Sequence, residues 1–137
     1  VHMNDVLIPV TMCHELSHLS GYMREDEANF IAFLACLQSD DPEFRYSGVY
    51  LASVHAMNAL LTVDSDLWNQ ADALKSDALR RDIRSNNAYW KQYETPVSEV
   101  SDRVNDAYLK ANGQENGLRS YGRMVDLLLA YYRDELQ

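Results

Sequence analysis

Two histidines and a glutamate stand at a spacing that can hold a metal ion and activate a water molecule. They form the pattern HExxH, in the run His14-Glu15-Leu16-Ser17-His18. Residues four apart lie on one face of a helix, about one turn from each other, so both imidazoles can reach one zinc ion. Glu15 lies beside them, where its carboxylate can take a proton from a metal-bound water. The pattern predicts a hydrolytic zinc site on a helix.

A catalytic zinc site also needs a third protein ligand and one open position for water. In the template HExxHxxGxxH the third ligand is a histidine. This chain has the glycine, Gly21, but carries Arg24 at the last position. Arginine has no lone pair to offer a metal, so this template does not apply. The acids that follow, Glu25 and Glu27, are the remaining candidates.

Glu25 opens a block that resembles the ExxAD element of gluzincins, in which the glutamate is the third zinc ligand. The block reads Glu25-Asp26-Glu27-Ala28-Asn29, with Asn29 in place of the aspartate that hydrogen-bonds a ligating histidine in those enzymes. An amide oxygen can still accept an imidazole N–H. Glu25 and Glu27 point about 200° apart on a helix, so only one of them can bind the metal. We favour Glu25, which shares a face with Asn29, over the alternative ligand Glu27; Asp26 and Glu27 then stabilise the helix start.

The step from His18 to Glu25 is short, with six residues between them, fewer than gluzincins use. Gly21 must therefore turn the chain sharply, so that a second helix folds back on the first. A close approach is possible because the second helix carries a stripe of small side chains, at Ala28, Ala32 and Ala35.

Helical periodicity and capping signals predict an all-α fold, and no segment shows the alternation of a strand. We expect one compact domain over residues 1–137, a bundle of six to seven helices that includes a zincin-like HExxH helix. The predicted helices span residues 5–20, 25–38, 42–63, 66–84, 85–93, 95–111 and 120 onward. The first of them is apolar nearly all round, which is typical of a helix buried in the middle of a domain, with Glu15 buried beside the metal.

Composition excludes several classes of partner. The chain has 12 Lys and Arg against 21 Asp and Glu, a net charge of −9, so we expect no binding to nucleic acid or, by charge alone, to anionic lipid. Cys13 and Cys36 have no CxxC partner and lie in apolar helical stretches, so we expect buried free thiols rather than a disulfide. No apolar run is long enough to span a bilayer.

Further polar side chains could stabilise the oxyanion of a tetrahedral intermediate or contact a substrate. They lie on the third and the last predicted helices, at Tyr46, Tyr50, His55, Tyr121 and Arg123. For those on the third helix, core packing with satisfied polar groups is the commoner role.

Three longer blocks resemble an uncharacterised bacterial family of membrane-anchored, metallopeptidase-like proteins. They are HELSHLSGYMREDEANFIAFLAC, SGVYLASVHAMNAL and YLKANGQENGLRSYGRMVDLLLAYY, and together they extend over most of the chain. The resemblance implies a metallopeptidase by motif and membrane helices ahead of this region. We expect this domain itself to be soluble and, because free thiols indicate a reducing compartment, to lie in the cytoplasm. The chain would then be part of a longer protein, which agrees with a first helix that begins almost at residue 1. The resemblance implies no particular substrate.

The leading hypothesis is a zinc peptidase domain that acts on a peptide or protein. Zinc would be held by His14, His18 and Glu25, and Glu15 would act as general base. The alternative is a zincin-like domain that binds metal or a partner without hydrolysis, since Asn29, the short ligand spacing and the lack of a strand to align substrate all depart from active zincins. A third hypothesis is a structural helical domain with both histidines in a polar core network.

Overall fold

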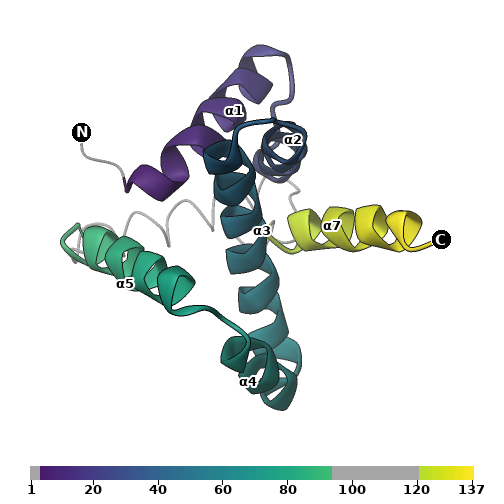
Figure 1. Cartoon of the computed structure of the whole chain (residues 1–137). Coiled ribbons are helices and arrows are strands. Elements are labelled where there is room, and N and C mark those ends of the chain that lie inside the picture. The colour runs from purple at the N-terminus through teal and green to yellow at the C-terminus, as the bar shows by residue number, and fades with distance from the viewer. Residues whose placement is uncertain (1–3, 94–120) are drawn as a thin grey trace, which may run out of the picture.

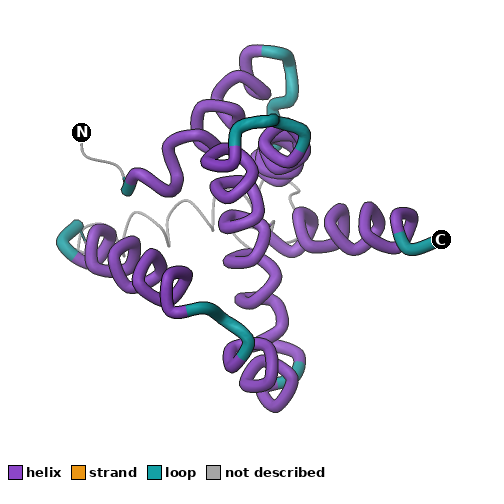
Figure 2. Tube along the Cα trace, in the orientation of Figure 1, coloured by secondary structure: helices purple, strands orange, loops and turns teal. Residues whose placement is uncertain are grey.

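The computed structural model describes residues 4–93 and 121–137, and every regular element in these two ranges is helical (Figures 1 and 2). A 3₁₀ turn and six α-helices follow one another: η1 (Asp5–Leu7), α1 (Ile8–Leu19), α2 (Glu25–Leu37), α3 (Pro42–Val63), α4 (Ser65–Ala73), α5 (Asp77–Lys91) and α7 (Tyr121–Glu135). The all-α prediction is therefore confirmed for the described residues. The helix predicted over residues 95–111 lies outside them.

Capping residues set the starts of α3 and α4 as predicted. The Asp41 carboxylate accepts the backbone N–H of Glu43 at 2.8 Å, and Pro42 occupies the first helical position. Asp64 accepts the backbone N–H groups of Asp66 and Leu67 at the start of α4. A side-chain acceptor at this position pairs with backbone donors that have no partner within the helix. The local sequence thus positions both helix starts without tertiary help.

The prediction of one helix over residues 66–84, followed by a second over 85–93, is wrong. The chain leaves the helix after Ala73 and enters α5 at Asp77, and α5 then continues without a break to Lys91. Ser76 accepts the backbone N–H of Leu79 at 3.1 Å and so caps α5. Arg80 donates to the carbonyl of Asp72, which satisfies an acceptor at the end of α4. Local capping outweighs the apolar periodicity that continues across residues 74–76.

The helix α3 is the central element of the packing (Figure 1). One core cluster joins α2, α3 and α7 and consists of Phe33, Ala52, Met124 and Leu128. A second joins α1 and α2 and consists of Val10, Ala32 and Cys36. The start of α1 is also tied to α3, because the buried Ser47 hydroxyl accepts the backbone N–H of Val10 at 3.0 Å. These contacts position the α1–α2 hairpin, which carries the HExxH pattern.

Gly48 allows α2 and α3 to approach closely. A methyl group at Gly48 would lie 2.6 Å from Cβ of Cys36 and 3.3 Å from the carbonyl oxygen of Phe33. We expect Gly48→Ala to lower the free energy of unfolding by up to about 2 kcal/mol, since overpacking costs about 1–3 kcal/mol and the gain in helix propensity offsets about 1 kcal/mol. Denaturant unfolding measures the change. Gly122→Ala is the control, because nothing lies within 4 Å of a methyl group there, and it should cause no loss.

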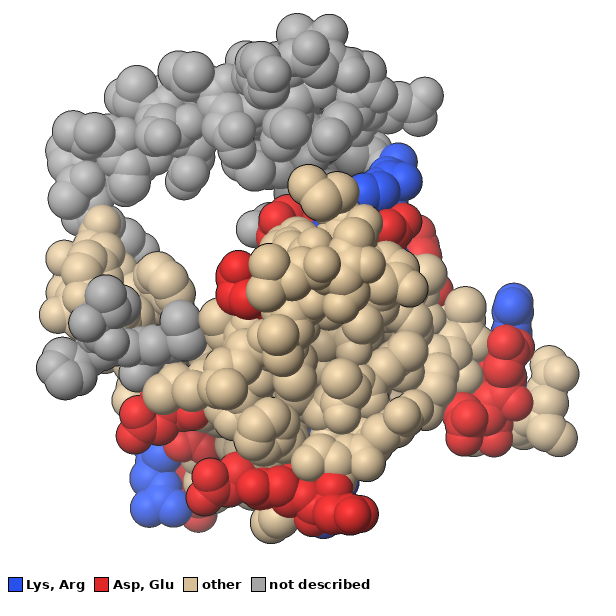
Figure 3. All heavy atoms as spheres, turned by 90° about the horizontal axis from the view of Figure 1, so that it is seen from above, with Lys and Arg blue, Asp and Glu red and all other residues tan. Residues whose placement is uncertain are grey.

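The expectation that α1 is buried all round is wrong. Val10 and Ser17 are buried, but a stripe of apolar side chains on the other face is exposed: Ile8, Met12, Leu16 and Leu19. Within residues 4–93 and 121–137, α1 packs mainly against η1, α2 and α3, which cover one of its faces. Figure 3, which looks onto the end of the molecule that carries the α1–α2 turn, shows a broad area of uncharged side chains bordered by acidic ones. No helix in the described ranges combines the length and the apolarity needed to cross a bilayer.

Candidate metal centre

The turn after α1 reverses the chain as the sequence predicts. Gly21 has φ 103°, a left-handed conformation that glycine adopts without penalty. Its N–H donates to the carbonyl of His18 at 3.0 Å, and the N–H of Tyr22 donates to the carbonyl of Ser17 at 3.1 Å. This pair of bonds is the Schellman arrangement, which satisfies the last carbonyls of a helix. As a result α2 begins at Glu25, beside the end of α1.

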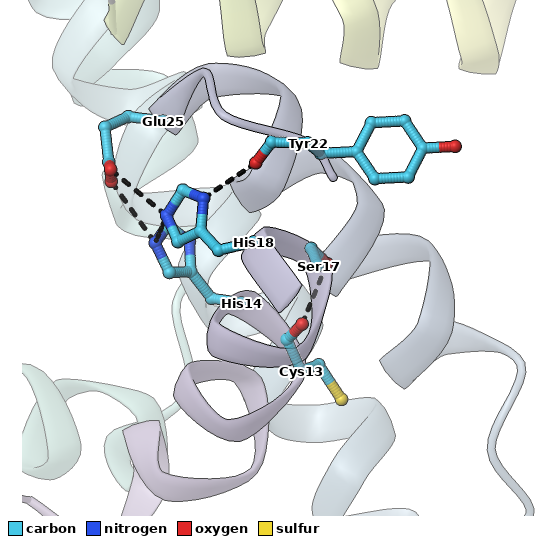
Figure 4. A network of polar contacts seen from close by, with 6 residues as sticks. All are labelled: Cys13, His14, Ser17, His18, Tyr22 and Glu25. Atoms are coloured by element: carbon cyan, nitrogen blue, oxygen red, sulfur yellow. Dashed lines mark hydrogen bonds and ion pairs between the residues drawn. The ribbon is translucent and has the colours of Figure 1, made fainter. Parts of the chain in front are cut away.

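Three side chains converge between the two helices (Figure 4). Nε2 of His14 lies 3.2 Å from one carboxylate oxygen of Glu25, and Nε2 of His18 lies 3.1 Å from the other. The two Nε2 atoms are 3.0 Å apart, with the rings perpendicular. The side chain of His14 is 13% exposed and that of Glu25 is 66% exposed, so the group lies at the surface with its histidine side covered.

A backbone hydrogen bond determines the tautomer of His18. Its Nδ1 lies 2.7 Å from the carbonyl oxygen of Tyr22, which can only accept, so Nδ1 carries a proton. A neutral His18 then presents an unprotonated Nε2 to the carboxylate of Glu25 and to Nε2 of His14. Lone pairs that converge in this way need a metal ion or a hydrogen-bond donor among them. A metal ion can fill this role, and so can an N–H at Nε2 of the neutral His14 imidazole.

The spacing of the three groups fits a tetrahedral zinc ion. Zinc–ligand bonds of about 2.0–2.1 Å place neighbouring ligand atoms of a tetrahedron about 3.3 Å apart. The two Nε2 atoms are 3.0 Å apart, and they lie 3.2 and 3.1 Å from two different oxygens of the Glu25 carboxylate, either of which could be the ligand atom. Two imidazole nitrogens and a carboxylate are a donor set that zinc prefers, and a metal-ligating histidine commonly donates its other N–H to a backbone carbonyl. The exposed side of Glu25 would leave a fourth position open to water.

Glu15 is exposed on α1, next to His14. The expectation that it is buried is therefore wrong, because no other helix in the described part of the chain covers the face of α1 that carries it. An exposed carboxylate needs no metal or partner to compensate for lost hydration. Its position along α1 next to the histidines is the feature that qualifies it as a base.

Glu27 lies away from the histidines. Its carboxylate is 4.0 Å from the guanidinium of Arg24, a surface pair that contributes little to stability. Both residues line a cavity of about 280 Å³ together with Asp26, Arg123, Asp126 and Leu127. The structure thus brings Glu25, and not Glu27, to the imidazoles, and it brings Arg123 close to the start of α2.

Asp26 is not the exposed helix-start acid that its position suggests. It is 4% exposed, and its carboxylate accepts a backbone hydrogen bond from Met124 of α7. Burial raises the pKa of Asp26, and the hydrogen bond from Met124 offsets part of that rise. Asp26 therefore joins α2 to α7 immediately after the candidate ligand Glu25. An acidic pattern at a helix start carries no signal of this tertiary contact.

The partner predicted for a ligating histidine is replaced by a backbone group. Among the described residues Asn29 makes no hydrogen bond to either imidazole, and the carbonyl of Tyr22 accepts from His18 instead. The Tyr22 ring points away from the site (Figure 4). Sequence reasoning missed Tyr22 because a backbone carbonyl has no side-chain signature. The one available signal was Gly21, which sets the turn that directs this carbonyl.

The two tyrosines proposed for the oxyanion contact α5 instead. The hydroxyl of Tyr46 donates to the carboxylate of Asp82 at 2.5 Å, and the side chain of Asn86 hydrogen-bonds the hydroxyl of Tyr50. Burial, then the hydrogen bond to Asp82 and its negative charge, raise the pKa of Tyr46 well above its usual range. This polar cluster holds α5 against α3.

The other candidates occupy separate places. His55 is half-buried in α3, and its burial lowers its pKa. Tyr121 is the first residue of α7, and its side chain lies outside the described part of the chain.

We expect Gly21→Ala to weaken both the fold and the site. The substitution forces a residue with a Cβ to adopt φ 103°, which costs about 1–2 kcal/mol, although no atom lies within 4 Å to collide with the new methyl group. Any relaxation of the turn also moves the Tyr22 carbonyl away from His18, which lowers zinc affinity. Thermal unfolding and a zinc titration measure the two effects. Gly21→Asn should lose less, since asparagine tolerates this conformation better.

Comparisons with known proteins identify one relationship. Residues 1–129 match a family described as "Protein of unknown function (DUF3810)". Neither a curated protein nor a solved structure matches the chain.

Proposed function

The chain belongs to the DUF3810 family of proteins of unknown function, and we propose that it is a zinc-dependent peptidase domain. His14, His18 and Glu25 would hold the zinc ion. Bound zinc would supply Lewis acidity and lower the pKa of a coordinated water to about 7. Glu15 would take a proton from that water and pass it to the leaving amine of a peptide or protein substrate. Membrane anchorage, which the family resemblance implies, and a cytoplasmic location, which the free thiols favour, belong to the same proposal.

One observation carries the metal part of this proposal. Nε2 of His18 is directed at Glu25 and His14 while its Nδ1 donates to the Tyr22 carbonyl. This arrangement prepares a lone pair for a cation and reduces the reorganisation that zinc binding would require. The part that concerns hydrolysis rests on Glu15 in the HExxH pattern and on the exposed side of Glu25.

A second candidate function is a metal-binding or partner-binding domain that hydrolyses nothing. Two observations favour it. The cavity lined by Arg24, Asp26 and Arg123 is formed by α2 and α7, and neither histidine of α1 lines it. In residues 4–93 and 121–137 there is also no strand beside the site to align an extended peptide. His14, His18 and Glu25 would then serve regulation or stability rather than catalysis.

Zinc binding to the purified chain tests the metal site. We expect one zinc per chain by elemental analysis after dialysis, and a cobalt(II) form with the intense visible absorption of tetrahedral coordination. His14→Ala should lose both signals. His55→Gln removes an imidazole outside the cluster and should keep them. Failure of the wild type to bind zinc, or unchanged binding in His14→Ala, would contradict the zinc site and leave His14, His18 and Glu25 as a hydrogen-bonded cluster.

A further inference from the structure

Two thiols meet on the helices that carry the candidate ligands. The Sγ atoms of Cys13 on α1 and Cys36 on α2 are 3.7 Å apart, and the thiol of Cys36 donates to the sulfur of Cys13. Both are free cysteines. Cys13 directly precedes His14, but its side chain points away from the imidazole rings (Figure 4). The pair therefore lies outside the candidate metal centre, although it joins the same two helices.

Packing holds the two sulfurs in place. Cys36 is fully buried in the cluster with Val10 and Ala32, and Cys13 packs against this cluster. The backbone of Gly48 on α3 lies so close to Cys36 that even a methyl group would collide with its Cβ. Full burial and this close helix contact restrict the movement of the Cys36 side chain. Because interiors are close-packed, this contact is a stable feature of the α1–α2 interface.

We propose that Cys13 and Cys36 are a redox-sensitive pair that forms a reversible disulfide between α1 and α2. A disulfide has an S–S distance of about 2.05 Å, so from 3.7 Å each sulfur needs to move by less than about 1 Å. A movement of this size is within the reach of small side-chain and helix adjustments. Both thiols are free, as the sequence predicts, and the proposal adds that each has the other as a neighbouring reaction partner.

The reaction balances with a low-molecular-weight disulfide, such as oxidised glutathione, as the oxidant. Cys13 is the more exposed of the two, so its sulfur attacks one sulfur of the oxidant, which releases one thiol and leaves a mixed disulfide on Cys13. The sulfur of Cys36 then attacks the Cys13 sulfur, forms the internal bond and releases a second thiol. The protein loses two protons and two electrons, and the oxidant becomes two thiols.

Burial fixes the order of these two attacks. It raises the pKa of Cys36 to about 12, and the contact with Cys13 adds to this rise. Cys36 is therefore the poorer nucleophile toward an oxidant from solution, and the first attack falls to Cys13.

The disulfide would close the chain segment between the two cysteines into a loop. This loop contains all three candidate ligands, His14, His18 and Glu25. Closing a loop of this length should raise the thermal midpoint by roughly 10 °C. In so far as the proposed zinc site is correct, the oxidised chain should also bind zinc more tightly than the reduced chain. The disulfide would hold α1 against α2 before the metal binds. By thermodynamic linkage, bound zinc should in turn favour formation of the disulfide.

Intact mass tests the disulfide without reference to zinc or to hydrolysis. The folded, metal-free wild-type chain is equilibrated in buffers of increasing oxidised-to-reduced glutathione ratio, then denatured with N-ethylmaleimide to label the remaining thiols. We expect an unlabelled monomer about 2 Da lighter than the reduced chain, with one cross-linked peptide that contains both cysteines. Cys36→Ala should instead accumulate glutathione on Cys13, and in Cys13→Ala the buried Cys36 should stay unmodified until denaturation.

Three results would overturn the proposal. They are a lasting glutathione adduct on Cys13 of the wild type with Cys36 still labelled, a disulfide that forms only between chains, and two labelled thiols at every redox ratio. Since the measurement uses the folded wild type, misfolding of a variant does not affect it. A chain that forms the disulfide but binds no zinc would refute the zinc site and retain the redox pair.

Discussion

Glu15→Gln should lower peptide hydrolysis by about 10²–10⁴-fold, which is the usual contribution of general acid–base catalysis, and should leave zinc affinity almost unchanged. Glutamine has nearly the same shape as glutamate but cannot accept a proton at neutral pH. Glu15 is exposed on α1, so the substitution removes no buried contact. The measurement is kcat/KM on a mixed fluorogenic peptide library, with the zinc content determined on the same samples.

Glu43→Gln is a matched control for the Glu15 variant. Glu43 is also exposed, in the first turn of α3, and its substitution should not change hydrolysis. Hydrolysis that persists in Glu15→Gln would show that another group acts as base. A wild type that binds one zinc and cleaves no peptide would instead favour the metal- or partner-binding alternative.

Glu25→Ala should lower zinc affinity by more than about 100-fold. Loss of a group that merely hydrogen-bonds a metal ligand already costs about 10–100-fold, and Glu25 faces both imidazoles directly, at 3.2 and 3.1 Å. The fold should tolerate the change, because the Glu25 side chain is 66% exposed. Competition with a chromophoric chelator measures the affinity. The rise in thermal midpoint caused by zinc in the wild type should be lost in the variant.

Glu27→Ala separates the two acids that the sequence left as alternatives. It lies in the same first turn of α2, but its carboxylate faces Arg24 at 4.0 Å. We expect its zinc affinity to stay within a few-fold of the wild type. The reverse outcome, with zinc lost in Glu27→Ala and kept in Glu25→Ala, would contradict the assignment of the third ligand.

In the wild type, zinc affinity should also fall as the pH is lowered, because protons compete for the imidazole lone pairs.

The sequence by itself determined the features that depend on neighbouring residues. The start of α3 follows from Asp41 and Pro42, and the turn after α1 follows from Gly21. Helical spacing places His14 and His18 on one face of α1. These features could be predicted because caps, turns and helical periodicity are set by interactions over a few residues.

Apolar periodicity alone did not predict where α4 ends and α5 begins, because capping decides both. The helix expected over residues 66–84 is interrupted because Ser76 caps a new helix and Arg80 satisfies the carbonyl of Asp72. Arg80 lies eight residues from Asp72 in the chain, so the bond that completes the break is not visible in the local pattern of apolar residues.

Only the tertiary structure decided how the two helices of the site face each other. It places Glu25 rather than Glu27 against the imidazoles, directs the Tyr22 carbonyl to His18, and leaves Glu15 exposed. It also places the thiol of Cys36 against that of Cys13. The physical reason is that one turn of helix presents side chains in every direction. Which of these directions is covered depends on how closely α2 and α3 pack against α1, and that depends on small or buried residues far apart in the chain, such as Ala32, Ser47 and Gly48.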